Sequence, residues 1–256
     1  MPVLPGAEPF LHDGSDEIGM LLCHGFTGSP QGLRPWGEHL AAEGLTVRCP
    51  RLPGHGTDWR EMNRTRWTDW YGRVAEELAA VSARCATVLV GGLSMGGALA
   101  LRLAQERGAS VAGLVLVNPS VTTLRRDMAL LPVLSRVVAS MPPVGNDIAK
   151  PGVTELAYDR TPLRAANSLR HLWRAVRADL PKVTQPVLLF RSAVDHVVEA
   201  VNSQIVLAEI GSSDVTEVVL ADSYHVATLD NDAQTIFAGS VEFARRVHAE
   251  RVGEPA

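Results

Sequence analysis

Residues 86–97 constrain the architecture more than any other run in the chain, and they read Ala86-Thr87-Val88-Leu89-Val90-Gly91-Gly92-Leu93-Ser94-Met95-Gly96-Gly97. The first five are uncharged and rich in β-branched side chains, which is typical of a buried strand. Residues 92–96 match G-x-S-x-G, in which a serine occupies a strained turn between a strand and a helix. A helical pattern follows to about residue 106. The run therefore predicts an exposed, nucleophilic Ser94. A glycine-rich turn without chemistry, or one that holds a phosphate, is the alternative, but the dinucleotide fingerprint G-x-G-x-x-G is not satisfied.

Short apolar runs and longer helical patterns alternate on both sides of this motif. Strands are expected at 19–23, 46–49, 86–90, 111–117, 186–190 and 217–220, and helices at 30–43, 68–84, 96–106 and 232–250. This alternation is typical of an α/β fold with a mostly parallel central sheet flanked by helices. A chain of 256 residues is short enough to form one such domain, 1–256.

One segment interrupts the alternation. Between Asn118 and the strand at 186, about 65 residues pass without a strand pattern, and a connection of that length is uncommon unless it has its own role. The segment contains an apolar run from Leu130 to Met141 and two expected helices, near 153–159 and 162–178. We predict a helical cap at about 120–178, inserted after the strand at 111–117. An ordinary crossover with extra helices is the alternative.

A serine hydroxyl is a weak nucleophile unless a base accepts its proton and a third group orients that base. Where G-x-S-x-G forms this turn, the chain order is nucleophile, acid and histidine, each after a later strand. Of the eight histidines, four precede Ser94 and two fall in the predicted cap or the last helix. His225 follows the strand at 217–220 and is the predicted base. His196 competes with it, but His196 is adjacent to Asp195 in the sequence, and the side chains of adjacent residues cannot easily form the hydrogen bond that orients the base.

The acid is selected by the same order. Asp195 follows the strand at 186–190, so it is the predicted acid. Asp222 competes, but it shares the loop of His225.

The oxyanion requires two N–H donors, and the residue after the nucleophile, Met95, supplies one. The other is expected from Phe26, in the loop after the strand at 19–23, although His24-Gly25 could also form a simple turn.

Composition excludes several other functions. The net charge of −4 is spread over interspersed acidic and basic residues, which argues against a nucleic-acid partner. The three cysteines show no metal-ligand spacing, and they fit a reducing compartment. The sequence contains no motif for a cofactor or a metal, no apolar run near the ~20 residues of a membrane span, and no secretory leader. A cytoplasmic location is therefore expected.

With these residues placed, the chain resembles the bacterial monoacylglycerol lipases and related small carboxylesterases of the α/β-hydrolase superfamily. The resemblance extends over nearly the whole chain and rests on residues 6–10 and 50–57, on Leu22-Cys23-His24-Gly25-Phe26-Thr27-Gly28, on residues 92–97, on Glu155-Leu156-Ala157-Tyr158, on Asp195-His196-Val197-Val198 and on Ser223-Tyr224-His225-Val226-Ala227-Thr228-Leu229-Asp230.

The resemblance implies the α/β-hydrolase fold, with Ser94, Asp195 and His225 as the triad. It implies Phe26 and Met95 as oxyanion donors, a small helical lid over an acyl tunnel, and a place for Glu155 near the pocket for a glycerol headgroup. The apolar cap residues are expected to face the substrate cleft, with Leu134 and Val138 as substrate-binding residues.

The expected activity is hydrolysis of monoacylglycerols through an acyl-enzyme. A broad carboxylesterase acting on short- to medium-chain esters, another chemistry of the superfamily (carbon–carbon bond hydrolysis or perhydrolysis), and a catalytically silent binding protein are the alternatives. A complete triad in the required order argues against the last. The expected partners are a small lipid ester and, through the cap, a transient contact with a lipid surface. The chain is expected to be a monomer or a homodimer.

Overall fold

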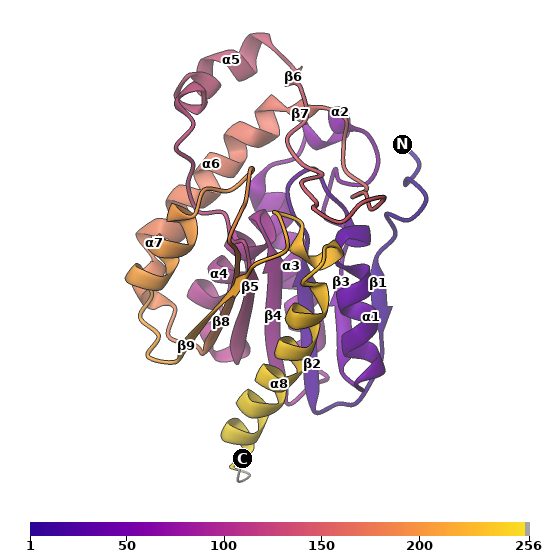
Figure 1. Ribbon diagram of the computed structural model, residues 1–256, viewed down its shortest axis with the longest axis vertical. Helices are drawn as coiled ribbons and strands as arrows, with labels where there is room; N and C mark the ends of the chain where they lie inside the picture. Colours follow the sequence, from indigo (N-terminus) through magenta and orange to yellow (C-terminus); the bar gives the residue numbers. More distant parts are fainter. Residues whose placement is uncertain (254–256) are drawn as a thin grey trace.

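The structure, a computed structural model, describes residues 1–253 apart from the side chain of Asp127. Its centre is a seven-stranded sheet in the order β1-β3-β2-β4-β5-β8-β9 (Figure 1). The strands are β1 (Phe10–His12), β2 (Ile18–Cys23), β3 (Thr46–Cys49), β4 (Thr87–Leu93), β5 (Gly113–Val117), β8 (Val187–Ser192) and β9 (Val215–Leu220). β1 pairs antiparallel with β3, and every other neighbouring pair in the sheet is parallel.

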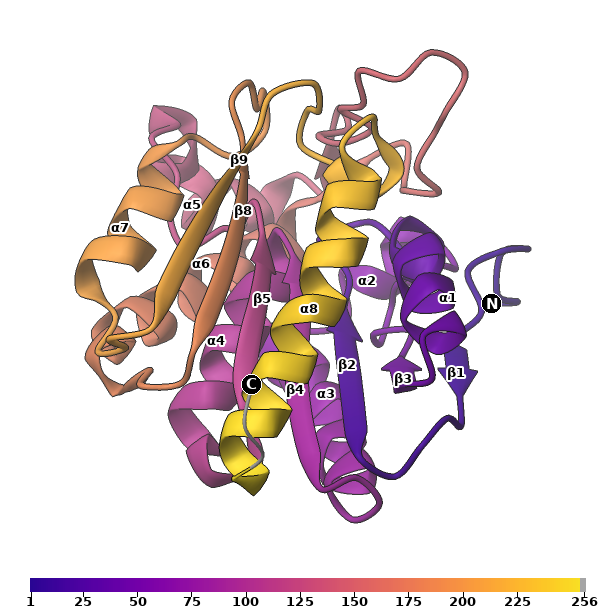
Figure 2. The ribbon, with the colours of Figure 1, turned by 60° about the horizontal axis from the view of Figure 1, so that its bottom comes forward.

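Helices cover both faces of the sheet (Figure 2). One layer is formed by α1 (Arg34–Ala42) and α8 (Ala233–Val252), and the other by α3 (Trp67–Ser82), α4 (Met95–Glu106) and α6 (Leu163–Ala178). The remaining helices are α2 (Trp59–Met62), α5 (Leu131–Val137), α7 (Val201–Glu209) and the short 3₁₀ turns at 30–33, 108–110, 126–130, 180–182 and 227–229. No helix in residues 1–253 is long and apolar enough to cross a membrane.

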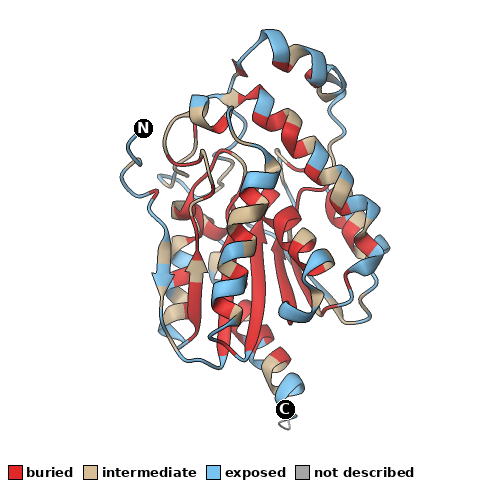
Figure 3. Cartoon of the chain, turned by 180° about the vertical axis from the view of Figure 1, so that it is seen from behind, coloured by how far each residue is buried: buried red, intermediate tan, exposed pale blue. Residues whose placement is uncertain are grey.

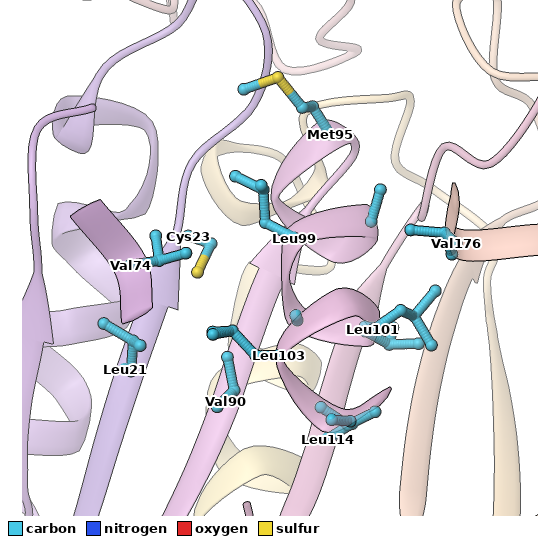
Figure 4. Packing of buried hydrophobic residues seen from close by; sticks show 14 of the residues in the cluster. Leu21, Cys23, Val74, Val90, Met95, Leu99, Leu101, Leu103, Leu114 and Val176 are labelled. Atoms are coloured by element: carbon cyan, nitrogen blue, oxygen red, sulfur yellow. The ribbon is translucent and has the colours of Figure 1, made fainter. Parts of the chain in front are cut away.

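The core lies between the sheet and its two helical layers, and its most buried part is formed by the inner strands β2, β4, β5 and β8 (Figure 3). Successive side chains of a strand point to opposite faces, so β2 contributes to both halves of the core. Leu21 and Cys23 pack with Val74 of α3 on one side (Figure 4). Met20 and Leu22 join the cluster beneath α1 and α8 on the other. The sheet is thus fixed from both faces, and its carboxyl edge is a rigid base for loops.

Outside the cap, the predicted strands and helices are present within a few residues of their expected bounds, and β1, α2 and α7 are present in addition. Residues 153–159 form no helix, contrary to the prediction. Their backbone bonds elsewhere: the Leu156 N–H donates to the Gln31 side chain and the Tyr158 N–H to the Thr27 carbonyl. β1, α2 and α7 were not predicted, because β1 and α2 are too short to show a period and α7 lacks a clear apolar face.

The segment predicted as a cap lies beyond the carboxyl ends of the strands, at the top of Figure 1. It contains α5 and a two-stranded hairpin, β6 (Ser140–Met141) with β7 (Thr161–Pro162). α5 packs against α6, and Leu131, Leu163 and Ala166 form a small separate cluster there. The later part of α6 differs, since Leu169 and Val176 belong to the main core. α6 therefore serves as the crossover helix between β5 and β8 as well as the floor of the cap.

Candidate active site

Ser94 lies at the junction of β4 and α4, with φ 57° and ψ −118°. A non-glycine residue with such a backbone is strained, and strain of this kind concentrates at functional sites. The flanking glycines explain how the turn can form. A Cβ on Gly92 would lie 2.3 Å from the Gly96 backbone, and one on Gly96 would lie 1.8 Å from the Cys23 carbonyl oxygen. The motif is therefore a steric requirement of a turn that lifts Ser94 above the sheet.

His225 and Asp195 are brought together by two neighbouring strands, since Asp195 follows β8 and His225 follows β9. The His225 Nδ1 lies 2.8 Å from the Asp195 Oδ2, and both side chains are almost fully buried. The other Asp195 oxygen accepts the N–H groups of Val197 and Val198, at 2.8 and 2.7 Å. Burial alone would raise the pKa of Asp195, but the hydrogen bond and charge of His225 and these two N–H groups outweigh it and hold the pKa below its ordinary value.

The competing residues lie elsewhere. His196 pairs with Asp147 at 2.9 Å, and its side chain is 59% exposed. Asp222 is exposed, and its backbone N–H donates to Asp232. Of the acids and bases weighed from the sequence, Asp195 and His225 are the pair in contact with each other.

The loop after β2 carries the expected oxyanion donor. Within residues 1–253, the N–H groups of Phe26 and Met95 donate to no protein acceptor, which leaves both available to a ligand. His24 fixes this loop: its Nε2 accepts the Leu52 N–H at 3.1 Å, so its Nδ1 donates to the Gly25 carbonyl at 3.0 Å. Burial lowers the pKa of His24 to about 4, so the ring is neutral and keeps this tautomer at ordinary pH.

Ser94 and His225 open into one cavity of about 410 Å³. Gly25 and Phe26 belong to its lining, as the expected oxyanion loop requires. Its walls are mainly apolar and come largely from the cap and α6, including Met128, Leu131, Leu134, Met141, Leu163 and Trp173. A cavity with an apolar wall and a few convergent polar groups is typical of a site for a small, mostly apolar molecule.

The three expected substrate-binding residues differ in their position relative to the cavity. Leu134 and Glu155 line the cavity, whereas Val138 is not among its lining residues and is 36% exposed. The expectation for Val138 assumed that helical spacing continues from Leu134. α5 ends at Val137, however, and Val138 has an extended backbone with φ −115° and ψ 125°. Its side chain therefore does not follow the face that Leu134 presents to the cavity.

Glu155 occupies an unusual position for a carboxylate. Its Oε1 lies so close to the oxyanion loop that a Cβ on Gly28 would be 2.5 Å away. Burial raises the pKa of Glu155, and the charge of the nearby His225 and a hydrogen bond from the Asn146 backbone to the carboxylate offset only part of that rise. A carboxylate can accept about four hydrogen bonds, so one backbone donor leaves most of its lone pairs available to a ligand in the cavity.

Sequence reasoning missed two residues beneath the His225 loop. The Asn118 side chain donates to the His225 carbonyl at 2.9 Å and accepts the Ser192 N–H at 2.8 Å. The Ser192 hydroxyl donates to the Tyr224 carbonyl at 2.8 Å. One signal was available, because Asn118 directly follows β5, and polar residues there lie at the carboxyl edge of a parallel sheet where ligands bind.

Comparisons with known proteins show the family of the chain. The profile of the family described as serine aminopeptidase, S33 matches residues 17–232. The chain is 42% identical over 244 residues to the thermostable monoacylglycerol lipase of Bacillus sp. (strain H-257), covering 94% of this chain and 96% of the relative. It is 24% identical over 241 residues to a carboxylesterase of Bacillus subtilis (strain 168), covering 94% of this chain and 97% of the relative.

Among solved structures, one from work on LipS and LipT, two metagenome-derived lipolytic enzymes, superimposes with a TM-score of 0.93. It is 40% identical in sequence and covers 96% of this chain and 100% of that one. The fold expected from the sequence, that of the α/β-hydrolases, is thereby confirmed.

Proposed function

This chain belongs to the serine aminopeptidase S33 family, and from that membership we propose that it is a carboxylic ester hydrolase that cleaves monoacylglycerols to glycerol and a free fatty acid. The family takes its name from peptide hydrolysis, but the two relatives that match 94% of this chain are a lipase and a carboxylesterase. The apolar cavity wall also favours an acyl chain over a peptide.

In the proposed mechanism, His225 accepts the proton of Ser94 as the serine oxygen attacks the ester carbonyl. The N–H groups of Phe26 and Met95 hold the oxyanion of the tetrahedral intermediate. His225 then protonates the leaving glycerol, and the acyl group remains on Ser94. Water, activated by the same histidine, hydrolyses this ester and releases the fatty acid. Asp195 fixes the His225 tautomer and stabilises the imidazolium; its lowered pKa supports this role because the carboxylate stays charged.

The observation that carries the monoacylglycerol proposal is the Glu155 carboxylate, which lines the same cavity as Ser94, lies beside the oxyanion loop and keeps free lone pairs in addition to its hydrogen bond from the Asn146 backbone. A monoacylglycerol has two free hydroxyl groups near its ester, and an alkyl ester has none. The hydroxyl groups of the glycerol headgroup could therefore donate to the remaining lone pairs of this carboxylate, while the cap wall takes the acyl chain. Leu134 would contact that chain.

The test compares hydrolysis of 1-monolauroylglycerol, ethyl laurate and p-nitrophenyl acetate, with Ser94→Ala as the blank. We expect a clear preference for monolauroylglycerol over ethyl laurate, and a loss of roughly 10⁴–10⁶ in kcat in Ser94→Ala and His225→Ala. Retention of most esterase activity in purified Ser94→Ala would rule out the triad. Equal rates on all three esters would leave a broad carboxylesterase.

The cap supports a further part of this proposal, a transient contact with a lipid surface. Leu124, Leu130, Val133 and Val137 are each more than 60% exposed. Exposed apolar side chains in that number mark an interaction surface. They lie on the segment that forms the cavity wall, so a contact there would bring the cavity to its substrate. The cytoplasmic location and the monomeric or homodimeric state expected from the sequence stay predictions.

A further inference from the structure

The backbone of Tyr224 and His225 lies outside any strand ladder, yet all four of its polar groups are bonded to side chains. From the main domain, Asp230 accepts the Tyr224 N–H at 2.8 Å. Ser192 donates to the Tyr224 carbonyl at 2.8 Å, and Asn118 donates to the His225 carbonyl at 2.9 Å. A loop would otherwise depend on water for these bonds. Here the position of the His225 Cα is fixed by protein groups.

The fourth group, the His225 N–H, is held from the cap. It donates to the Asp147 Oδ2 at 3.2 Å. The same oxygen accepts the His196 N–H at 3.0 Å, and the other carboxylate oxygen pairs with the His196 Nδ1 at 2.9 Å. The Asp147 carbonyl also accepts the Val226 N–H at 3.0 Å. The Asp147 side chain is only 14% exposed, so these bonds are partly shielded from water.

Asp147 therefore joins the two loops that carry the acid and the base. His196 is the residue after Asp195, and one carboxylate oxygen accepts both its N–H and that of His225. A hydrogen bond to an ionised acceptor is roughly twice as strong as one between neutral groups. The neighbouring cap backbone is anchored as well, since Asp230 accepts the N–H groups of Ala149 and Lys150 at 2.7 and 2.9 Å.

We propose that Asp147 is a positioning residue for His225, so that the cap contributes to the chemical step and not only to substrate access. This inference rests on the proposed triad. The physical reason is that proton transfer between Ser94 and His225 depends on sub-ångström placement of the imidazole. The loop that carries the imidazole belongs to no strand ladder, so its position depends on these bonds to side chains. A 1 Å displacement of a reacting group can reduce the rate about 10²-fold.

The prediction differs from that for a lid that only shapes the acyl site. Loss of acyl-chain contacts would spare a substrate too small to reach the cap wall. Loss of His225 placement would slow turnover of every ester. p-Nitrophenyl acetate is therefore the informative substrate.

The experiment measures kcat and KM of Asp147→Ala and Asp147→Asn on p-nitrophenyl acetate, with active sites counted by a fluorophosphonate. For Asp147→Ala we expect kcat per active site to fall about 10–100-fold, with KM within about threefold of the parent. Asp147→Asn should keep at least about a third of the parent kcat, because its amide oxygen can still accept both backbone N–H groups. Its NH₂ then faces the His196 Nδ1, which becomes an acceptor in the other tautomer.

Two controls isolate the backbone bond. Asp159→Ala removes an exposed cap carboxylate that has no hydrogen-bond or ionic partner in the described part of the chain, and His196→Ala removes only the imidazole bonded to Asp147. Both should stay within about threefold of the parent kcat. Should Asp147→Ala not fold, Asp147→Ser, whose oxygen is too short to reach both N–H groups, replaces it.

The outcomes separate this inference from the proposed function. An active Ser94→Ala protein would overturn the triad, and the role of Asp147 with it. An inactive Ser94→Ala protein with an unimpaired Asp147→Ala would overturn the positioning role alone. So would equal losses in the alanine and asparagine variants, a rise in KM without a fall in kcat, or a His196→Ala defect as large as that of Asp147→Ala.

Discussion

At the scale of single residues, Glu155 combines a functional site with a local cost in stability. Burial raises the pKa of its carboxyl group, and the charge of His225 and a hydrogen bond from the Asn146 backbone offset only part of that rise. A raised carboxyl pKa means that the folded state disfavours the charged form, and destabilised groups of this kind are retained where activity needs them. Asp195 shows the opposite case, because three donors hold its pKa below its ordinary value.

Glu155→Gln is expected to reduce headgroup recognition. A neutral acceptor forms weaker hydrogen bonds than a carboxylate, so kcat/KM on 1-monolauroylglycerol should fall about tenfold. The value on ethyl laurate, which has no free hydroxyl group, should stay within about twofold. Steady-state kinetics on both esters measures the difference. An equal loss on the two esters would show that Glu155 does not select the headgroup.

The same variant should be more stable than the parent at neutral pH, by about 1 kcal/mol in the free energy of unfolding. Because the folded-state pKa of Glu155 is raised, protonation favours the folded parent. That contribution is fully present below the unfolded-state pKa and is lost as pH rises through the folded-state pKa. The advantage of Glu155→Gln should therefore be full above the folded-state pKa and disappear toward pH 4.5. Urea unfolding at pH 8 and pH 4.5 tests this, with the exposed Glu242→Gln on α8 as the matched control.

At the scale of elements, α5 has two faces with different environments. Leu131 and Leu134 line the cavity, whereas Val133 and Val137 are 68% and 79% exposed. The cap is bonded to the main domain on both sides of this helix. Asn202 accepts the N–H groups of Val121 and Thr122 before it. After it, Asp147 accepts the His196 N–H, and Asp230 accepts the Ala149 N–H. α5 itself packs mainly on α6.

Leu134→Asp tests the inner face of α5. A charge in the apolar wall should reduce kcat/KM on p-nitrophenyl laurate about 10–100-fold, because burying an unpaired carboxylate costs several kcal/mol unless it is neutralised or the site opens to water. Turnover of p-nitrophenyl acetate should change less than about threefold. Val133→Asp, on the exposed face of the same helix, is the matched control and should discriminate little between the two chain lengths. Similar losses on acetate and laurate in Leu134→Asp would contradict the proposed acyl wall.

At the scale of the whole molecule, charge is segregated although it looks interspersed along the sequence. Residues 120–178 contain nine Lys and Arg and four Asp and Glu, a net charge of +5, whereas the whole chain carries −4. The rest of the protein therefore carries −9. The cap thus combines positive charge with the exposed apolar side chains Leu130, Val133 and Val137. That combination suits an anionic lipid surface.

We expect the protein to sediment with vesicles that contain phosphatidylglycerol more than with pure phosphatidylcholine vesicles, and to be released by salt. Each cation near an anionic surface contributes about 1 kcal/mol, so Arg136→Glu on α5 should weaken binding by roughly tenfold or more. Arg245→Glu, on α8 in the opposite part of the molecule, should have little effect. Equal binding to both kinds of vesicle, insensitive to salt, would contradict an electrostatic contact. Binding to neither would remove the lipid surface as a partner.

The sequence alone predicted a candidate triad and the order of the main elements. Ser94 was marked by glycines that the turn requires sterically, and His225 and Asp195 by the order in which parallel strands deliver residues to one edge. The first signal is local and the second depends only on the order of the strands, so both can be recognised in one sequence. The helix expected near 153–159 shows the limit of local pattern: its backbone bonds to Gln31 and Thr27, far away in the sequence.

Only the folded structure revealed which cap residues face the cavity, that the Glu155 carboxylate lies beside the oxyanion loop, and that Asp147 accepts the His225 N–H. Each of these depends on where an irregular segment crosses the carboxyl edge of the sheet. Irregular backbone has no period that a sequence could display, because its polar groups are satisfied by distant side chains instead of by neighbours. For that reason Val138 was misplaced and Asn118, Ser192 and Asp147 were not foreseen, whereas the contact between Asp195 and His225 was.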